Sequence, residues 1–225
     1  MIEEVVKEVT KIMCNDNSGH GMDHVNRVYK LALSFAKEEG CNEYIAGLIA
    51  LLHDVDDYKL FGQDNASKLA NAKFVMEKCS ISEDIQKIVL NELKTIGFSK
   101  YLKGMRPTTK EGMVVLDADM CDALGSNGIA RAITYGNKIS RPLFDRNVFP
   151  NPVASYKHHM ITSGSTINFM FEVLLRYKDL MMTNAGKKVA SKRTDQIIDF
   201  MRAFFIEEDV PEWLEYLDNY INNNF

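Results

Sequence analysis

The stretch EYIAGLIALLHDVDD, residues 43–57, starts as an apolar segment and ends in titratable side chains. Between Glu43 and His53 the apolar residues would surround a helix on nearly every side, which indicates a helix buried all round. His53 and Asp54 stand at the C-terminal end of this apolar run. Because a buried carboxylate needs a partner or a cation, the stretch predicts a helical core with a charged site attached to it.

Outward from this stretch, apolar residues recur at intervals of three and four along almost the whole chain, which predicts an all-α fold. Gly40, Asn42 and Pro211 are typical of a helix stop, an N-cap and a first helical turn. We expect helices over residues 2–14, 23–39, 43–57, 64–78, 82–95, 111–124, 126–134, 164–182, 185–207 and 211–221. Residues 136–163 hold three of the five prolines and little periodicity, so we interpret them as an irregular, lid-like excursion.

Composition excludes several classes of protein. The 225 residues carry 27 basic and 31 acidic side chains, with no long run of one sign, so we expect no nucleic-acid partner. The acidic start of the chain is unlike a signal peptide, and no apolar stretch is long enough to span a membrane. The four scattered cysteines form no C-x-x-C pair and are typical of reduced thiols. We therefore expect a cytoplasmic protein without a membrane partner, as a monomer or a homodimer.

The chain has five histidines: His20, His24, His53, His158 and His159. On a helix, His24 falls on the apolar stripe that contains Val28 and Phe35, so we expect it to point inward. His158 and His159 lie in the proline-rich excursion, and we interpret them as surface residues. A single histidine on an apolar face is more often a core residue than a metal ligand, so His24 and His53 need further support.

That support comes from the stretch GMVVLDADMCDALG, residues 112–125. On a helix, Asp119 shares the apolar face of Leu116, whereas Asp117 points nearly opposite. An acidic cluster at a helix end is usually solvated. Together, however, several buried ionisable groups without partners would each be costly, and a divalent cation is the simplest common partner. The inward residues are His24, His53, Asp54 and Asp119, with Asp57 directed between the two members of the His-Asp pair if the helix continues.

Three segments carry a family resemblance: GHGMDHVNRVYKLA (19–32), ALLHDVDDYK (50–59) and VVLDADMCDALGSNGIARA (114–132). In the order His, His-Asp, Asp they resemble the HD superfamily of metal-dependent phosphohydrolases, in its small bacterial branch. The segment GSTINFMFEVLLRYKDLMMTNAGKKVASKR (164–193) is similar to the C-terminal part of that branch. The resemblance implies an HD-domain helical bundle with a C-terminal helical extension. We expect a single domain over 1–225, with a metal-binding core over about 15–135 and the excursion and C-terminal helices over 136–225.

The resemblance assigns the metal ligands to His24, His53, Asp54 and Asp119. Two imidazoles and two carboxylates suit one divalent ion, Mn²⁺ or Mg²⁺ first and other transition metals after them. Binuclear members of the superfamily use further histidines between the His-Asp pair and the last aspartate. Residues 55–118 contain none. We therefore expect a single metal ion, which argues against cyclic-nucleotide and cyclic-dinucleotide phosphodiesterases.

The Asp56-Asp57 pair resembles an acidic pair in pyrophosphate-cleaving relatives, which implies that one of the two orients or deprotonates the attacking water. Asp57 is the better candidate, and a solvated helix end is the alternative. His20 either assists the leaving group or is an ordinary loop residue. Our candidates for binding phosphate are basic residues near the motifs, with Lys59 first: Lys59, Arg27, Lys94 and Arg131.

The expected activity is metal-dependent hydrolysis of a small phosphorylated substrate, a nucleotide first. We expect cleavage of a nucleoside triphosphate to the monophosphate and pyrophosphate. The alternatives are a nucleoside monophosphate phosphatase and a weakly catalytic metal- and nucleotide-binding module. An HD-type iron oxygenase needs more histidines than residues 55–118 supply. The sequence leaves open the base, the number of phosphates and the metal.

Overall fold

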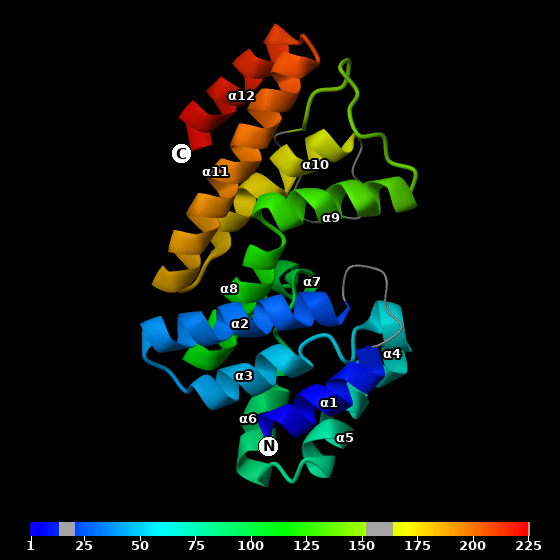
Figure 1. Ribbon diagram of the computed structural model, residues 1–225, viewed down its shortest axis with the longest axis vertical. Helices are drawn as coiled ribbons and strands as arrows, with labels where there is room; N and C mark the ends of the chain where they lie inside the picture. Colours follow the sequence, from blue (N-terminus) through cyan, green and yellow to red (C-terminus); the bar gives the residue numbers. More distant parts are fainter. Residues whose placement is uncertain (14–20, 152–163, 225) are drawn as a thin grey trace. The chain divides into compact units, whose positions relative to one another are not determined.

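The computed structural model describes residues 1–13, 21–151 and 164–224, and every regular element in these ranges is a helix (Figure 1). This confirms the all-α class. The elements are α1 (Ile2–Met13), α2 (Met22–Glu39), α3 (Glu43–Leu52), α4 (Tyr58–Lys68), α5 (Ala70–Lys78), α6 (Glu83–Leu93), α7 (Phe98–Leu102), α8 (Lys110–Asp122), α9 (Gly125–Lys138), α10 (Thr166–Glu172), the 3₁₀ helix η2 (Leu174–Leu180), α11 (Asn184–Glu207) and α12 (Pro211–Asn224). His20, His158 and His159 lie outside the described residues.

The chain forms two compact units. The first consists of Met1–Asp122 and Met182–Gly186, and the second of Ala123–Met181 and Lys187–Phe225. The short segment Met182–Gly186 therefore packs with α1 to α8, although it lies far along the chain.

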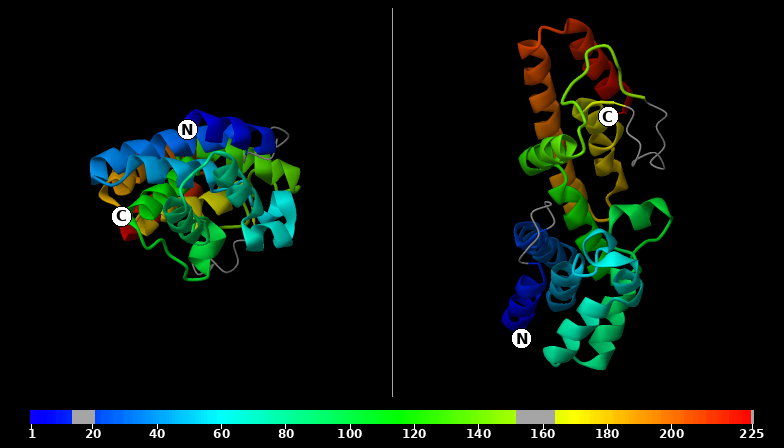
Figure 2. Two further views of the ribbon diagram at one scale, coloured as in Figure 1. Left: turned by 90° about the horizontal axis from the view of Figure 1, so that it is seen from below. Right: turned by 90° about the vertical axis from the view of Figure 1, so that its right-hand side faces the viewer.

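The core of the first unit is built around α3. Every residue from Ala46 to Leu52 is buried, as expected for a helix that is apolar on nearly every side. α3 packs against α1, α2, α6 and α8, and α2 also packs against α8 (Figure 2). Three helices from separate parts of the sequence, α2, α3 and α8, therefore meet in the middle of this unit.

The predicted helix ends are confirmed. Gly40 ends α2 in the left-handed conformation, with φ 67° and ψ 39°, which glycine adopts without steric cost. Asn42 caps α3, because its side chain accepts the N–H groups of Tyr44 and Ile45. Pro211 is the first residue of α12, where its missing N–H costs no helical hydrogen bond.

Three predicted helices have different bounds. The helix expected over 43–57 ends at Leu52, and turns over 53–56 precede α4, so the helical extrapolation that placed Asp57 was wrong. The helix expected over 64–78 is interrupted at Leu69, which has φ 51°. The helix expected over 164–182 divides into α10 and η2, and α7 was not expected. At the break before α5, the Asp56 carboxylate accepts the N–H groups of Asn71 and Ala72, a contact that the local periodicity does not predict.

In the second unit, α9 extends to Lys138, and the described part of the excursion, 139–151, is irregular as predicted. α12 folds back along α11 (Figures 1 and 2). Trp213 of α12 is fully buried, stacks on Phe149 with 4.4 Å between ring centroids, and donates its Nε1–H to the carbonyl of Arg146 at 3.0 Å. These aromatic contacts hold 139–151 on α12, so this part of the excursion is packed.

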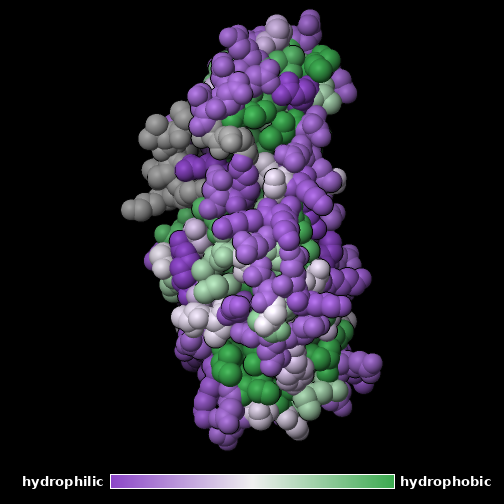
Figure 3. All heavy atoms as spheres, turned by 90° about the vertical axis from the view of Figure 1, so that its left-hand side faces the viewer, coloured by the Kyte–Doolittle hydropathy of each residue, from purple (hydrophilic) through white to green (hydrophobic). Residues whose placement is uncertain are grey.

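The surface is mixed in character. On the face drawn in Figure 3, hydrophobic residues occur in small groups among hydrophilic ones. In the part of the chain that the structure describes, no helix is long and apolar enough to cross a membrane.

Candidate metal centre

Four side chains from α2, the C-terminal end of α3 and α8 converge in the first unit. His24 Nε2 lies 3.1 Å from His53 Nε2, and Asp54 Oδ2 lies 3.4 Å from each of these nitrogens. Asp119 Oδ1 lies 3.5 Å from His24 Nε2 and 3.9 Å from His53 Nε2. Both imidazoles are buried, and the two carboxylates are only slightly exposed. The structure thus brings together the four residues that the sequence singled out.

The outer nitrogens of the two imidazoles are held by oxygen acceptors. His24 Nδ1 lies 2.7 Å from Asp122 Oδ2, and His53 Nδ1 lies 2.7 Å from the carbonyl oxygen of Ala50. Because neither oxygen can donate, each Nδ1 carries the proton. In the neutral form of each imidazole, the lone pair of Nε2 is therefore directed toward the carboxylates of Asp54 and Asp119, as in histidines that ligate metals.

The electrostatics of the cluster favour positive charge. Burial by itself lowers the pKa of His53, but the charge and hydrogen bond of Asp54, together with the charge of Asp119, outweigh it and raise the pKa to about 9. Burial likewise opposes protonation of His24, but its hydrogen bonds to Asp122 and Asp54 raise its pKa. Without a metal ion, protons must neutralise the facing lone pairs and carboxylates.

The donor set fits one divalent cation. The ligand atoms of His24, His53 and Asp119 all lie within 4.8 Å of one another, and Asp54 Oδ2 adds a fourth donor at 3.4 Å from both imidazoles. Two nitrogens and two carboxylate oxygens suit Mn²⁺, Mg²⁺ and similar ions. A cation at this position would relieve the repulsion between the facing lone pairs and the two carboxylates.

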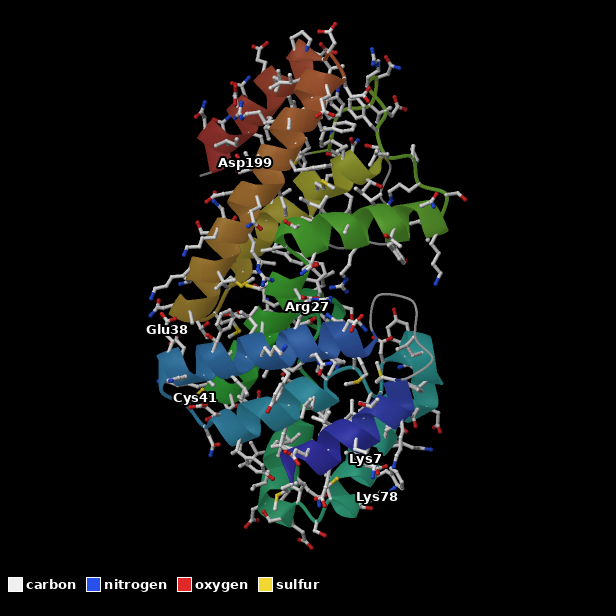
Figure 4. All side chains as sticks on the ribbon, viewed as in Figure 1. Lys7, Arg27, Glu38, Cys41, Lys78 and Asp199 are labelled. Carbon is white, nitrogen blue, oxygen red and sulfur yellow. The ribbon has the colours of Figure 1, made fainter. Side chains whose placement is uncertain are left out.

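A second layer of charge supports His24. Arg27 extends from α2 toward α8 (Figure 4), donating from Nε to Asp122 Oδ1 at 2.7 Å and from Nη2 to Asp122 Oδ2 at 3.0 Å. Asp122 therefore accepts from both Arg27 and His24. Sequence reasoning did not select Asp122, although it stands three residues after Asp119 on α8, a spacing that places both side chains on neighbouring positions of one helix face.

Lys100 is a further residue that sequence reasoning missed. Its Nζ donates to the carbonyl oxygen of Leu93 at 2.7 Å. Burial lowers its pKa, opposed by the nearby negative charges of Asp54, Asp57, Asp119 and Asp56. The negative charge of the candidate centre therefore acts on the half-buried ammonium group of Lys100. No sequence signal marks it, because Lys100 is 46 residues from the His-Asp pair on a helix that was not expected.

Comparison with known proteins supplies the family. A family model described as "HD domain" matches residues 21–124, which include all four converging residues. A solved HD-superfamily hydrolase from Bacillus thuringiensis is 32% identical, with 93% of this chain and 97% of that chain covered and a TM-score of 0.73. The chain belongs to the HD superfamily of hydrolases. This confirms the resemblance read from the sequence, and HD domains bind divalent metals.

Two further solved structures match over nearly the whole chain. A structure from Lactobacillus plantarum is 30% identical, with 92% of this chain and 96% of that chain covered and a TM-score of 0.76. YpgQ of Bacillus subtilis, solved in complex with ADP, is 26% identical, with 94% and 98% covered and a TM-score of 0.69. The similarity therefore extends beyond the HD domain into the C-terminal helices.

The acidic pair after the HD motif divides into two different environments. Asp56 is buried, and its carboxylate accepts the backbone N–H groups of Asn71 and Ala72, both at 2.9 Å, at the start of α5. The Asn65 side chain donates to it as well, at 2.7 Å. Asp57 is half-buried, and its backbone carbonyl begins α4. Asp56 therefore holds the start of α5, whereas the backbone carbonyl of Asp57 holds the start of α4.

Four other residues were predicted for the site: Lys94, Arg131, Lys59 and His20. Lys94 is exposed at the C-terminal end of α6. Arg131 belongs to α9 in the second unit. Lys59 is the second residue of α4, two positions after Asp57, and His20 falls outside the described residues. Arg27, by contrast, contacts Asp122, the side chain that lies against His24 of the four-residue cluster.

Proposed function

We propose that this chain is a metal-dependent pyrophosphohydrolase that cleaves a nucleoside triphosphate to the monophosphate and pyrophosphate. The observation that carries the proposal is the convergence of two imidazole nitrogens and two carboxylate oxygens, with Arg27 bound to the Asp122 carboxylate that lies against His24. Membership of a hydrolase superfamily supports the reaction class. The ADP complex of YpgQ supports a nucleotide as the substrate class.

In this proposal His24, His53, Asp54 and Asp119 hold one divalent ion. When bound, the ion neutralises phosphate charge and makes a nearby water more acidic. The protein prepares the site in advance, because the Nδ1 contacts of both histidines fix their lone pairs toward it. Three helices supply the donors, so the packing of α2, α3 and α8 sets the spacing between them.

Basic groups of the protein receive the phosphates. A triphosphate carries more negative charge than one divalent ion neutralises, so the site needs further cations. Lys100 presents a half-buried ammonium group next to the carboxylates, and Arg27 presents a guanidinium group whose side chain is 36% exposed. Lys59 stays our first candidate from the sequence for a third cation. These charges suit a chain of phosphates better than a single one.

Asp57 is the proposed general base. Its carboxylate accepts a proton from the attacking water, whose oxygen forms a bond to the α-phosphorus. The bond from this phosphorus to the oxygen bridging the α and β phosphates breaks, and that oxygen leaves with pyrophosphate. In this proposal Asp54 and Asp119 bind the ion, and the carboxylate of Asp56 accepts the N–H groups that begin α5. Asp57 is chosen because the Asp56-Asp57 pair resembles the acidic pair of pyrophosphate-cleaving relatives.

The experiment is a product analysis in H₂¹⁸O with nucleoside tri-, di- and monophosphates and Mn²⁺, Mg²⁺ or Co²⁺. We expect one labelled oxygen in the monophosphate and none in pyrophosphate. Label in orthophosphate, with nucleoside as the co-product, would establish a monophosphatase instead. Tight nucleotide binding without turnover under any of the three metals would establish a binding module.

The role of Asp57 is tested by Asp57→Asn. We expect turnover to fall about 100-fold or more, the usual effect of removing a general base, while metal affinity stays at the parental value. Asp64→Asn is the matched control, because Asp64 is an exposed aspartate of α4 paired with Lys68. Parental turnover in Asp57→Asn would show that Asp57 has only a structural role, at the N-terminal end of α4.

A further inference from the structure

The carboxylate of Asp122 joins two residues that sequence reasoning treated separately. Its Oδ2 accepts from His24 Nδ1 at 2.7 Å and from Arg27 Nη2 at 3.0 Å, and its Oδ1 accepts from Arg27 Nε at 2.7 Å. The Asp122 side chain is only 1% exposed. A carboxylate this deeply buried stays ionised only when it is well paired, and the two-point contact with Arg27 supplies that pairing.

We propose that Asp122 is a positioning residue that, held in place by Arg27, keeps the proton of His24 on Nδ1 and the lone pair of His24 on Nε2. The inference rests on the proposed metal-dependent function, because it assigns a task within the same site. Arg27 thereby has two roles. It fixes Asp122 through Nε and Nη2, and it carries positive charge at a partly exposed position next to the centre.

The contrast between the two histidines supports a special role for this contact. His53 donates its Nδ1–H to the backbone carbonyl of Ala50, within its own helical turn, so no side chain is needed to hold it. His24 lies on α2, and its Nδ1 partner comes from α8, 98 residues along the chain. The Nδ1 contact of His24 therefore comes from a side chain, and a single substitution can remove it.

An asparagine at position 122 cannot reproduce the contacts of the carboxylate, because one of its two terminal atoms is an NH₂ donor. With the NH₂ group at the Oδ1 position, it faces the Nε–H of Arg27. With the NH₂ group at the Oδ2 position, it faces Arg27 Nη2 and donates to His24 Nδ1. The second arrangement moves the histidine proton to Nε2 and blocks the metal-directed lone pair.

The test compares Asp122→Asn with Asp117→Asn. Asp117 is a second buried aspartate of α8, but its carboxylate accepts from Met182 and Thr183 and does not touch a histidine. We expect Asp122→Asn to weaken Mn²⁺ binding about 10- to 100-fold by calorimetry, the usual effect of losing the outer partner of a ligating histidine. Asp117→Asn is expected to lower the melting temperature and keep the Mn²⁺ affinity within about threefold.

A spectroscopic measurement reads the tautomer directly. In the Mg²⁺-loaded parent with ¹⁵N-labelled histidine, long-range ¹H–¹⁵N spectra should place the His24 proton on Nδ1. We expect this signal to be lost or moved to Nε2 in Asp122→Asn. Parental Mn²⁺ affinity together with an unchanged Nδ1–H signal in Asp122→Asn would overturn the proposal.

Arg27→Gln keeps the proposal testable if Asp122→Asn does not fold, because the Arg27 side chain is partly exposed. It should weaken Mn²⁺ binding by about 3- to 10-fold, less than Asp122→Asn, because Arg27 acts through Asp122. Unchanged affinity in Arg27→Gln would overturn the part assigned to Arg27. Neither readout uses a nucleotide, so a chain that binds metal as expected but hydrolyses no triphosphate would refute the proposed function and leave this inference standing.

Discussion

Replacing Gly186 with alanine should destabilise the first unit, even though alanine is the better helix former. Gly186 lies in the first turn of α11, where the chain returns to the first unit. A Cβ at this position would lie 2.3 Å from Asp117 Oδ2 and 2.8 Å from the Cβ and Cγ of Asp117. Asp117 is fully buried on α8, so its carboxylate has no open space into which to move.

The expected loss of unfolding free energy follows from the hydrogen bonds that the Asp117 carboxylate accepts. Asp117 Oδ2 accepts the N–H of Thr183 at 2.8 Å and the Oγ1–H of Thr183 at 2.7 Å, and Oδ1 accepts the N–H of Met182 at 2.9 Å. Ordinary contact begins at 3.4 Å, so Oδ2 has to retreat by about 1.1 Å, which disrupts bonds worth about 1.5–3 kcal/mol each to a charged acceptor. Against this stands about 1 kcal/mol gained from replacing glycine in a helix. We expect a net loss of about 2–4 kcal/mol.

The assay is thermal unfolding of the first unit, where this loss corresponds to a fall of about 5–15 °C in the melting temperature. Ser191→Ala is the matched control, since it places an alanine at an exposed position of the same helix and should change the melting temperature little. A double-mutant cycle with Asp117→Ala identifies the cause, because without the carboxylate the Gly186→Ala change should become neutral or stabilising. A higher melting temperature in Gly186→Ala than in the parent, as expected at an unhindered glycine in a helix, would refute the reasoning.

Three further predictions concern the candidate centre. Removing the metal with EDTA should lower the melting temperature, because an ion at 100 times its Kd contributes about 2.7 kcal/mol; an unchanged melting temperature after verified metal loss would contradict the site. The pKa of His53 is raised from 6.5 to about 9, so its protonation stabilises the metal-free fold fully below pH 6.5, and this contribution is lost as pH rises through about 9. Since the ion competes with that proton, Mn²⁺ affinity measured by calorimetry should rise over the same interval, whereas a flat profile would show that His53 does not exchange a proton for the metal. Asp56→Ala should cost about 1–3 kcal/mol in urea unfolding, because the N–H groups that open α5 lose their acceptor, while Mn²⁺ affinity is retained; a lost metal site with an unchanged fold would place Asp56 in the centre instead.

The all-α class, the buried helix α3 and the ends marked by Gly40, Asn42 and Pro211 could be predicted from the sequence. These features depend on local backbone preferences and on the helical period, which a few neighbouring residues carry. The same holds for the inward direction of His24, since its position on the apolar stripe of α2 follows from the spacing of its neighbours. The family resemblance then linked His24 to the His-Asp pair and Asp119.

Only the tertiary structure decided which further residues belong to the site. It added Asp122 and Lys100, and it gave Asp56 and Asp57 different environments. Asp122 meets His24 across 98 residues, and Asp117 meets Met182 across 65, so neither pairing leaves a periodic trace in the sequence. Asp56 and Asp57 are adjacent in the chain, yet one is buried at the start of α5 and the other is half-buried, because α3 ends at Leu52 and the backbone turns between them and the helix. A helical period describes the direction of a side chain only while the helix continues, and the packing of other helices decides where it stops.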